Sequence, residues 1–487
     1  MKGNRAKLQS APKPFWRLFL FFYIWGIITT GIGILLVLVL HFERYNEAVI
    51  YGAALLFGVF GVWAIWSWRE MTASVFDAYT LFFISALLFN GGEALLRCFG
   101  VDARFSFFEY FCERTVAETL GLVLLGLYAF HAGALLCGKI SLGFKTSFHP
   151  GNAAQLEEIR WVGWILIFLS FLPAVFYFQD SLSSVMNYGY FSLFNLDPTI
   201  GFAATDQVLA TFLVPGVLFL LAGSRGKLFN LIMAMLLIGS YTAVRLFLGS
   251  RAWAAMPVIV FAFIWHRAIF KIPKILLFSG GMLLLFLIFP LVGEIRNIPG
   301  QQRLSFPILA EIFISLENPV ISILSEMGGS IKTVAYTLEL VPEVRSYDFG
   351  VGYLNAVFTV VPNLFWSIHP AIARGTAGEW LMKTIDPLTA YLGGSMGYSF
   401  IAESYLNFGW IGSPLLLFGL GIAYAKLVFW AQEADDPARM AMLASFLSFV
   451  LFFPRSESAL VVRPLIWYAF VPYLMVLSIR YLKKVFR

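Results

Sequence analysis

Residues 393–409 read GGSMGYSFIAESYLNFG, and this stretch carries an acidic residue, Glu403, into an otherwise apolar run. The stretch follows on from residues 293–398, with which it overlaps. These residues are the only long segment between apolar runs, and they are rich in Pro, Gly and charged residues. A carboxylate in an apolar helix is costly unless it faces a partner or a polar cavity. The stretch therefore predicts a functional segment that the rest of the chain positions.

The composition places this segment in a membrane protein. The 487 residues are 60% hydrophobic and only 13% charged, with a mean hydropathy of +0.80. Soluble globular chains are about half apolar and about a quarter charged. The chain is too apolar to hide its hydrophobic surface in one aqueous core, so we expect an all-α, polytopic membrane protein. The net charge of +6 is spread over short loops and does not indicate binding to nucleic acid.

Runs of about 20 apolar residues predict transmembrane helices. They divide the chain into about nine spans in residues 1–292, a large loop in 293–398, and about three spans in 399–487. The twelve runs lie near residues 15–40, 48–67, 75–97, 115–137, 159–179, 206–223, 228–248, 252–268, 275–292, 406–430, 440–454 and 464–482.

Lysine and arginine predict the orientation of these spans, because cytoplasmic flanks carry an excess of them. If the basic N-terminus, with Lys2, Arg5 and Lys7, is cytoplasmic, alternation places most of the 34 Lys and Arg residues in inside flanks. The even number of spans then leaves both termini in the cytoplasm and residues 293–398 outside it.

The large loop is predicted to fold. Residues 306–313, 320–324 and 331–340 are apolar enough for short helices, separated by prolines. We expect them to lie along the outer membrane face or to pack on the helix bundle. A long loop with structure of its own is usually functional.

Arginine is favoured over lysine in the predicted outer flanks, and its planar fork of donors suits a diphosphate. Two of these arginines flank Gly249-Ser250 near the membrane edge, one begins the large loop, one lies within it, and two bracket the last outer loop. Anchoring at the membrane interface is the structural alternative for each. The candidate anion-binding residues are Arg245, Arg251, Arg296, Arg374, Arg455 and Arg463.

The spacing of Ser399, Glu403 and Asn407 places these polar residues on one helical face. Glu403 suits a general base, or else a structural ion pair with an arginine. Asn407 is a further candidate for substrate contact, as is Tyr405 on another side of the helix. His369, the only histidine in the large loop, is the alternative base, although a loop histidine is often simply solvated.

The sequence indicates no cofactor and no metal. It contains no Asp-x-Asp, no His-Glu-x-x-His and no Cys/His cluster. The three cysteines form no Cys-x-x-Cys pair, and Cys98 and Cys112 could bridge only if their loop is outside the cytoplasm; unpaired thiols are the simpler interpretation.

Together these features resemble the Wzy-type O-antigen polymerases and, more broadly, bacterial polymerases and ligases of lipid-linked oligosaccharides. The matching residues are Gly249-Ser250-Arg251, Glu294-Ile295-Arg296 and, above all, residues 397–409. A large outer loop late in the chain also fits, and the resemblance implies a GT-C-like polymerase/ligase fold.

The resemblance implies a substrate and a place. Undecaprenyl-diphosphate-linked repeat units would be joined at the periplasmic face of a bacterial inner membrane, without metal, with the lipid diphosphate as leaving group. Arginines would bind the diphosphate, and Glu403 or His369 would take the proton of the acceptor hydroxyl. A chain-length regulator is an implied protein partner.

Three other functions stay open. An O-antigen ligase would transfer finished glycan to lipid A core, and the acceptor distinguishes it from a polymerase. A flippase or other transporter of lipid-linked sugars would need charged residues along the full bilayer depth, whereas the membrane-edge arginines lie mostly on one side. A purely structural scaffold explains Glu403 poorly.

Overall fold

The computed structural model describes residues 15–101, 106–140, 151–194, 203–303, 305–315, 318–361, 366, 368–433 and 436–486. Every element in this part of the chain is helical. Lys2, Arg5 and Lys7, which are predicted to be cytoplasmic, lie outside the described residues.

Among the described residues, 11 helices are long and apolar enough to cross a membrane, which confirms the predicted fold class. The number rises to 12 if 306–314 and 319–340, bent by 89°, form one broken span. The predicted run at 206–223 forms only a shorter apolar helix, Gln207–Ala222. The long helices are α1 (Phe15–Leu36), α2 (Glu47–Thr72), α3 (Ala78–Cys98), α5 (Glu113–Ile140), α6 (Ala153–Tyr188), α9 (Leu228–Phe247), α10 (Arg251–Ile264), α11 (Lys274–Leu283) with α12 (Phe289–Ile295), α20 (Phe400–Glu433), α21 (Pro437–Val450), and α22 (Ala459–Pro464) with α23 (Val471–Val485).

Short π-helical segments extend or join several of these spans: η1 (Val37–His41), η3 (Trp265–Ile269), η4 (Leu284–Ile288) and η7 (Leu465–Phe470). Shorter helices connect them: α4 (Phe107–Tyr110), α7 (Ala203–Thr211) and α8 (Leu213–Ala222), with single turns η2 (Tyr190–Phe194), η5 (Gly300–Gln302) and η6 (Phe453–Arg455).

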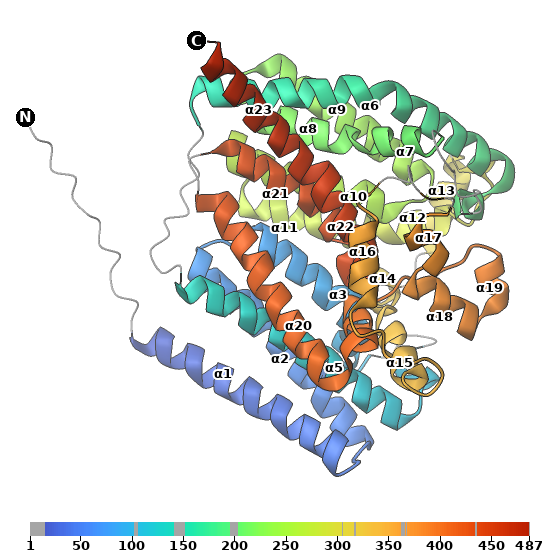
Figure 1. Ribbon diagram of the computed structural model, residues 1–487. Helices are drawn as coiled ribbons and strands as arrows, with labels where there is room; N and C mark the ends of the chain where they lie inside the picture. Colours follow the sequence, from blue (N-terminus) through green and yellow to red (C-terminus); the bar gives the residue numbers. More distant parts are fainter. Residues whose placement is uncertain are drawn as a thin grey trace, which may run out of the picture.

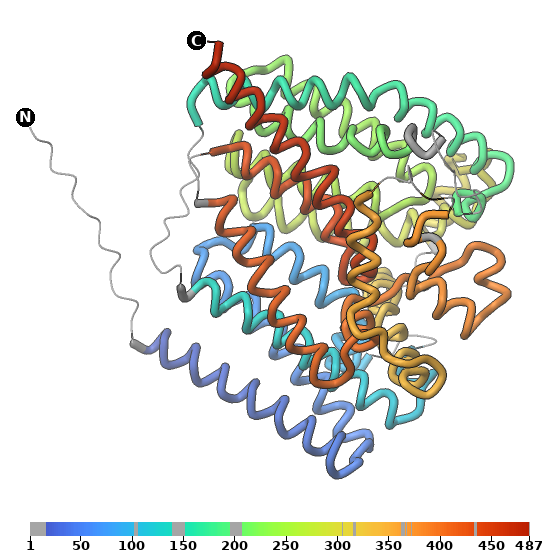
Figure 2. The backbone as a smooth tube through the Cα atoms, viewed as in Figure 1, coloured from blue at the N-terminus to red at the C-terminus, as the bar shows by residue number. Residues whose placement is uncertain are grey.

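The spans form one bundle with two distinct ends. α1 begins and α23 ends at the same end, on the left of Figure 1. The helices of the large loop gather at the opposite end, called here the loop end, and Figure 2 follows the chain between the two. They are α13 (Phe306–Ser315), α14 (Pro319–Gly328), α15 (Ile331–Leu340), α16 (Val351–Phe358), α17 (Pro370–Arg374), α18 (Ala377–Ile385) and α19 (Pro387–Tyr391).

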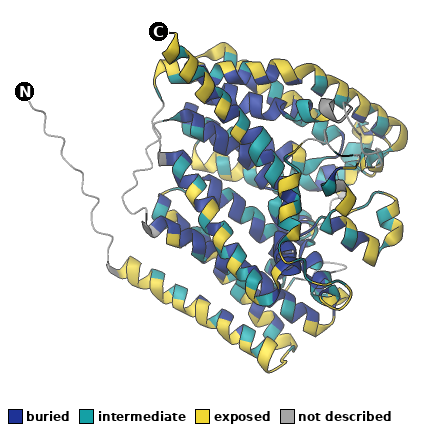
Figure 3. Ribbon diagram, viewed as in Figure 1, coloured by how far each residue is buried: buried dark blue, intermediate teal, exposed yellow. Residues whose placement is uncertain are grey.

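Burial follows the position of each helix in the bundle. α3, α5 and α21 are mostly buried, whereas α1 and α6 expose large apolar side chains along their length (Figure 3). In a polytopic protein such exposed apolar faces are the surface that contacts lipid. The bundle is therefore built from an inner layer of helices packed on one another and an outer layer facing the bilayer.

Part of the large loop packs into the bundle. α14 lies against α3 so closely that a Cβ atom on Gly92 would sit 2.3 Å from the Leu324 carbonyl oxygen. Only glycine permits this approach. α15 packs on α5 and buries Ile331 and Val334 completely. These two helices take the packed alternative of the two arrangements expected for the loop.

Buried polar groups on α3 are paired with residues from other segments, most of them in the second half of the chain. Asn90 donates to the Pro454 carbonyl oxygen at 3.0 Å and accepts a short hydrogen bond from Ser399. Glu93 accepts from Ser106 at 3.1 Å and lies 3.8 Å from the Lys332 ammonium. No disulfide joins Cys98 and Cys112.

Candidate functional site

A break in α20 brings the large loop onto its first turns. Gly409 adopts φ 64° and ψ −162°, which interrupts the helical hydrogen bonding. The carbonyl oxygens of Leu406 and Asn407 accept instead from the backbone N–H groups of Asp348 (2.9 Å) and Phe349 (3.0 Å). The loop is thereby fixed to the helix that carries Glu403.

The Asn407 side chain strengthens this attachment. Its Oδ1 accepts from the N–H groups of Gly350 (3.0 Å) and Gly352 (3.3 Å) at the start of α16, and its Nδ2 donates to the Glu403 carbonyl oxygen at 2.8 Å. The side chain is fully buried. Asn407 therefore positions α16 relative to Glu403.

Glu403 is 3% exposed, and both of its carboxylate oxygens accept hydrogen bonds from Ser458. The Ser458 hydroxyl donates to Oε1 at 2.5 Å, and its backbone N–H donates to Oε2 at 2.8 Å. These two donors fix the plane of the carboxylate. The hydrogen-bond partner of Glu403 is thus Ser458, and neither of these bonds is the ion pair with an arginine that was the alternative.

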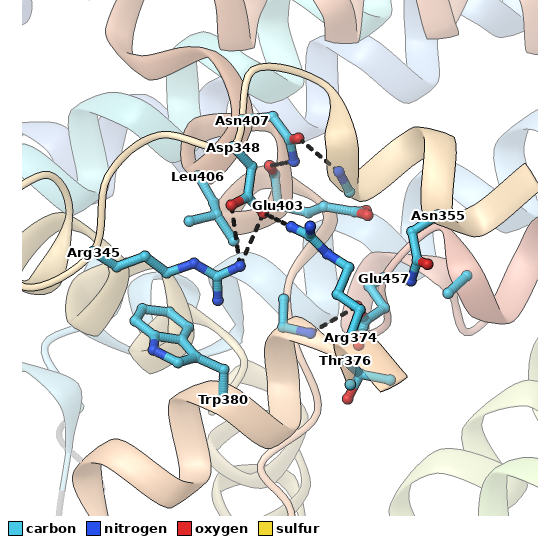
Figure 4. A pocket seen from close by; sticks show the side chains of 14 residues that line it. Arg345, Asp348, Asn355, Arg374, Thr376, Trp380, Glu403, Leu406, Asn407 and Glu457 are labelled. Carbon is cyan, nitrogen blue, oxygen red and sulfur yellow. Dashed lines mark hydrogen bonds and ion pairs between the residues drawn. The ribbon is translucent and has the colours of Figure 1, made fainter. Parts of the chain in front are cut away.

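Glu403 lines a small polar pocket of about 40 Å³ at the loop end. Figure 4 shows the side chains that surround it, which come from α16, α17, α18, α20, α22 and the segments before α16, α18 and α22. The charged side chains of the lining are Arg345, Asp348, Arg374, Glu403 and Glu457; the others include Asn355, Thr376, Trp380 and Asn407.

Two arginines of the pocket share one carboxylate. Arg374 donates to Asp348 Oδ2 at 2.6 Å, and Arg345 reaches both Asp348 oxygens at 3.0–3.1 Å (Figure 4). The Arg345 guanidinium also lies 4.5 Å from the centre of the Trp380 ring. Such pairing orders both guanidinium groups at the rim of the pocket.

Glu457 is the second acid beside Glu403. It accepts from the N–H groups of Ala377 (2.9 Å) and Gly378 (3.5 Å) at the start of α18. Burial raises the pKa of the Glu457 carboxyl above 4.5, and these two N–H groups offset part of the rise. The pocket lining thus contains the buried carboxyl group of Glu403 and the half-buried one of Glu457, besides Asp348, which is paired with the two arginines.

Three of the predicted anion-binding arginines meet elsewhere at the loop end, around Glu326 of α14. Arg251 forms a short bidentate pair with this carboxylate, and Arg296 lies 3.6 Å from it. Arg455 donates to the Glu326 backbone carbonyl oxygen at 3.4 Å. Three guanidinium groups against one carboxylate leave an excess of two positive charges, and we call these four residues the arginine cluster.

A cavity of about 390 Å³ adjoins the arginine cluster. It is formed by residues 186–191 and 296–300, and Arg296 stands over the Tyr190 ring at 5.6 Å. Its size is within the range of ligand sites. Arg303 supports its wall from behind by donating to the carbonyl oxygens of Phe247, Arg296 and Ile298 at 2.7–3.1 Å.

One short segment joins the arginine cluster to the Glu403 pocket. Arg455 reaches the cluster, whereas Glu457 and Ser458 belong to the pocket. Three residue steps span at most about 10–11 Å. The 455–458 segment therefore carries residues of both sites within this distance along the backbone.

The other predicted site residues lie apart from both places. Arg245 is enclosed by aromatic rings and donates to the hydroxyls of Tyr241 (3.2 Å) and Tyr177 (3.4 Å). Arg463 lies on α22, and its Nε is buried without a hydrogen bond to any described residue. Tyr405 is buried, with its hydroxyl 3.4 Å from both the Val341 carbonyl oxygen and the Tyr347 hydroxyl.

Both ring nitrogens of His369 are occupied. Nδ1 accepts from the Ala371 N–H at 3.1 Å, so Nε2 carries the proton and donates to the Val361 carbonyl oxygen at 3.0 Å. The ring is buried and does not line the Glu403 pocket. The ring therefore links the backbone groups of Val361 and Ala371.

Several residues of these sites were not identified from the sequence. Asp348, Arg345, Glu457 and Glu326 are not among the site residues predicted above. Asp348 is three residues from Arg345, a spacing that could have suggested their pairing. No comparable signal exists for Glu326, because its partner Arg251 lies 75 residues away.

A comparison with protein families identifies the chain. The family model for O-antigen polysaccharide polymerase Wzy matches residues 19–486. The chain belongs to the Wzy family. Searches of curated proteins and of solved structures found no match.

Membership of the Wzy family confirms the resemblance seen in the sequence. It supports an O-antigen polymerase that acts on lipid-linked glycan repeat units, and thus favours this function over a flippase or a ligase. Both the arginine cluster and the Glu403 pocket lie within the matched region. Among the described residues, no group of three or more His, Cys, Asp and Glu side chains is arranged to hold a metal ion.

Proposed function

We propose that this Wzy-family chain joins undecaprenyl-diphosphate-linked repeat units by metal-independent glycosyl transfer. The observation that carries the proposal is the 455–458 segment, which joins a cluster with excess positive charge to the pocket that contains the carboxyl groups of Glu403 and Glu457. A glycosyl transfer from a lipid diphosphate needs both parts: an anion site for the leaving group and a base for the acceptor.

The arginine cluster is the proposed diphosphate site. A diphosphate that links a lipid to a sugar carries two negative charges, which equals the excess of positive charge on Arg251, Arg296 and Arg455 over Glu326. Arg251 already binds a carboxylate in bidentate geometry, and the same fork fits two phosphate oxygens. Donors that are already in place stabilise the charge that develops on the departing diphosphate.

Glu403 is the proposed general base. It would take the proton of the acceptor hydroxyl while that oxygen forms a bond to the anomeric carbon of the donor sugar. The bond from this carbon to the diphosphate oxygen breaks, and the lipid diphosphate leaves with the bonding electron pair. Ser458 keeps the Glu403 carboxylate in one orientation during this step. Arg345, Arg374 and Trp380 would contact the glycan at the rim.

The remaining predicted residues take smaller parts in this proposal. Asn407 positions α16, and Arg374 belongs to the glycan side of the pocket rather than to the diphosphate site. Arg245, Arg463 and Tyr405 would shape the surroundings without touching the reacting atoms. His369 is set aside as a base because both of its ring nitrogens are hydrogen-bonded to the backbone.

The proposal includes a place in the cell. The loop end would face the periplasm, and both termini would lie in the cytoplasm, as the distribution of Lys and Arg predicts. The chain would sit in the inner membrane, with a chain-length regulator as protein partner. Reaction of single-cysteine variants at the loop end with an impermeant thiol reagent in intact cells tests the orientation.

A reconstituted polymerisation assay tests the function. The purified protein receives its host's lipid-linked repeat unit without nucleotide and with a chelator, and the products are separated on a gel. A ladder of increasing length is expected, and Arg251→Ala should abolish it, whereas the peripheral Arg463→Ala should retain it. Transfer that requires lipid A core would instead establish a ligase, and protein-dependent movement of the intact lipid across liposomes would establish a transporter.

A further inference from the structure

α16 lies between the Glu403 pocket and the outside of the bundle. It crosses the ends of the spans rather than running along them, beside α22 and in front of α20 (Figure 1). Asn407 holds its first turn, and the ring of Tyr353 stacks on Phe408 of α20 with centroids 6.1 Å apart. These contacts fix α16 in its position across the ends of the membrane-spanning helices.

The two sides of α16 differ in chemistry. Gly352 and Asn355 line the Glu403 pocket, and Ala356 is fully buried. Leu354 and Val357 point away from the protein and are each 56% exposed. The helix sequence, VGYLNAVF, contains no charged residue. A helix of this length with its outer side in water would normally carry charged residues there.

The helices on which α16 packs also expose apolar side chains. Ile411 and Leu415 of α20 are 80% and 67% exposed, and Leu460 of α22 is 59% exposed. Exposed side chains of this kind on membrane-spanning helices contact lipid. The apolar side of α16 therefore continues a lipid-facing surface, and lipid is the occupant that fits it.

We propose that α16 lies in the bilayer at the loop end and forms the boundary between the lipid chain of the substrate, which stays in the bilayer, and the Glu403 pocket, which receives the reacting sugar. The ligand class is a long-chain lipid diphosphate, and this role in substrate approach rests on the proposed function. Because Leu354 and Asn355 are consecutive, only the width of one helix, about 10 Å, separates lipid from the pocket. The lipid chain can therefore stay in the bilayer while the reacting hydroxyl of the sugar reaches the pocket.

Fluorescence quenching tests where α16 lies, without any need for activity. Cysteines are introduced singly at Leu354, Val357 and Lys383 after replacement of the three native cysteines, and each is labelled with bimane. Lys383, an exposed residue of α18, is the control in water. In nanodiscs of brominated phospholipid, the labels at 354 and 357 should lose fluorescence and the label at 383 should keep it. Retained fluorescence at 354 and 357 would overturn the proposal.

A comparison of two donors tests the role in substrate approach. Leu354→Glu should lower turnover of the long-chain lipid-linked donor several-fold and leave turnover of a water-soluble, short-chain diphosphate donor unchanged; Leu354→Met is the matched control. Equal loss with both donors would overturn this role even if the bimane labels are quenched. If the unmodified protein turns over neither donor, the proposed function fails, and the quenching result still decides separately whether α16 lies in the bilayer.

Discussion

Replacing Glu403 with glutamine removes the negative charge while keeping the shape of the side chain. If Glu403 is the base, the rate of polymerisation should fall by about 10²–10⁴-fold. That loss corresponds to about 3–5 kcal/mol of transition-state free energy. The structure also predicts a separate cost, because Glu403 accepts two hydrogen bonds from Ser458.

The cost to stability should be smaller than the cost to catalysis. Hydrogen bonds to a charged group contribute about 1.5–3 kcal/mol each, and the amide oxygen of glutamine still accepts one of them. We therefore expect Glu403→Gln to lower the free energy of unfolding by about 1–3 kcal/mol. Initial rates of ladder formation and the thermal unfolding temperature in detergent measure the two effects on the same sample.

Ser458→Ala is the matched control. It removes the hydroxyl that donates to Glu403 but leaves the backbone N–H and the base itself. Its stability should fall about as much as that of Glu403→Gln, whereas its rate should fall by no more than about tenfold. The reasoning is refuted if Glu403→Gln keeps more than a tenth of the rate, or if both variants lose activity equally, since Glu403 would then act only by holding the 455–458 segment.

Three further changes test the surroundings. Glu326→Gln removes the only carboxylate of the arginine cluster and should lower KM for the lipid-linked donor about 5- to 10-fold, about 1 kcal/mol; a raised KM would show that Glu326 is needed to orient Arg251. Arg303→Met leaves three backbone carbonyl groups without their donor and should destabilise the protein by about 3 kcal/mol or more, visible as a lower unfolding temperature; an unchanged temperature would contradict the bracing role. Burial raises the folded-state pKa of Glu457 above its ordinary 4.5, so the contribution of Glu457 to stability is fully present below that pH and is lost as the pH rises through the folded pKa. The unfolding temperature of Glu457→Gln should therefore fall less with rising pH than that of the unmodified protein. If the two curves of unfolding temperature against pH are parallel, Glu457 does not cause the pH dependence.

The membrane-spanning helices could be predicted because length and apolar composition alone determine whether a segment can cross a bilayer. The predicted run at 206–223 is the partial exception: its residues are apolar enough, but the helix is too short to rank with the long spans. That Glu403 would have a polar partner could also be predicted, since a carboxylate in an apolar run is costly without one. The identity of that partner, Ser458, depends on packing between two distant segments.

The grouping of the arginines could not be predicted. Arg251, Arg296 and Arg303 are all arginines near the loop end, yet the first two face Glu326 and the third braces the backbone. The sequence around a single arginine does not indicate which acceptor the side chain will contact in the folded protein. His369 illustrates the same limit, because its ring is occupied by backbone groups that any sequence could supply.

The pairing of Asn90 has a consequence for how the protein is made. Its partner Pro454 is separated from it by 364 residues. At a synthesis rate of about 5–20 residues per second, roughly 20–70 s pass between the two leaving the ribosome. During that interval the Asn90 amide of α3 lacks its acceptor, the Pro454 carbonyl oxygen. For part of the same interval Gly92 is not yet covered by α14. The packing around α3 can therefore be completed only after the segment between α21 and α22 has been synthesised, so the C-terminal part of the chain completes the bundle.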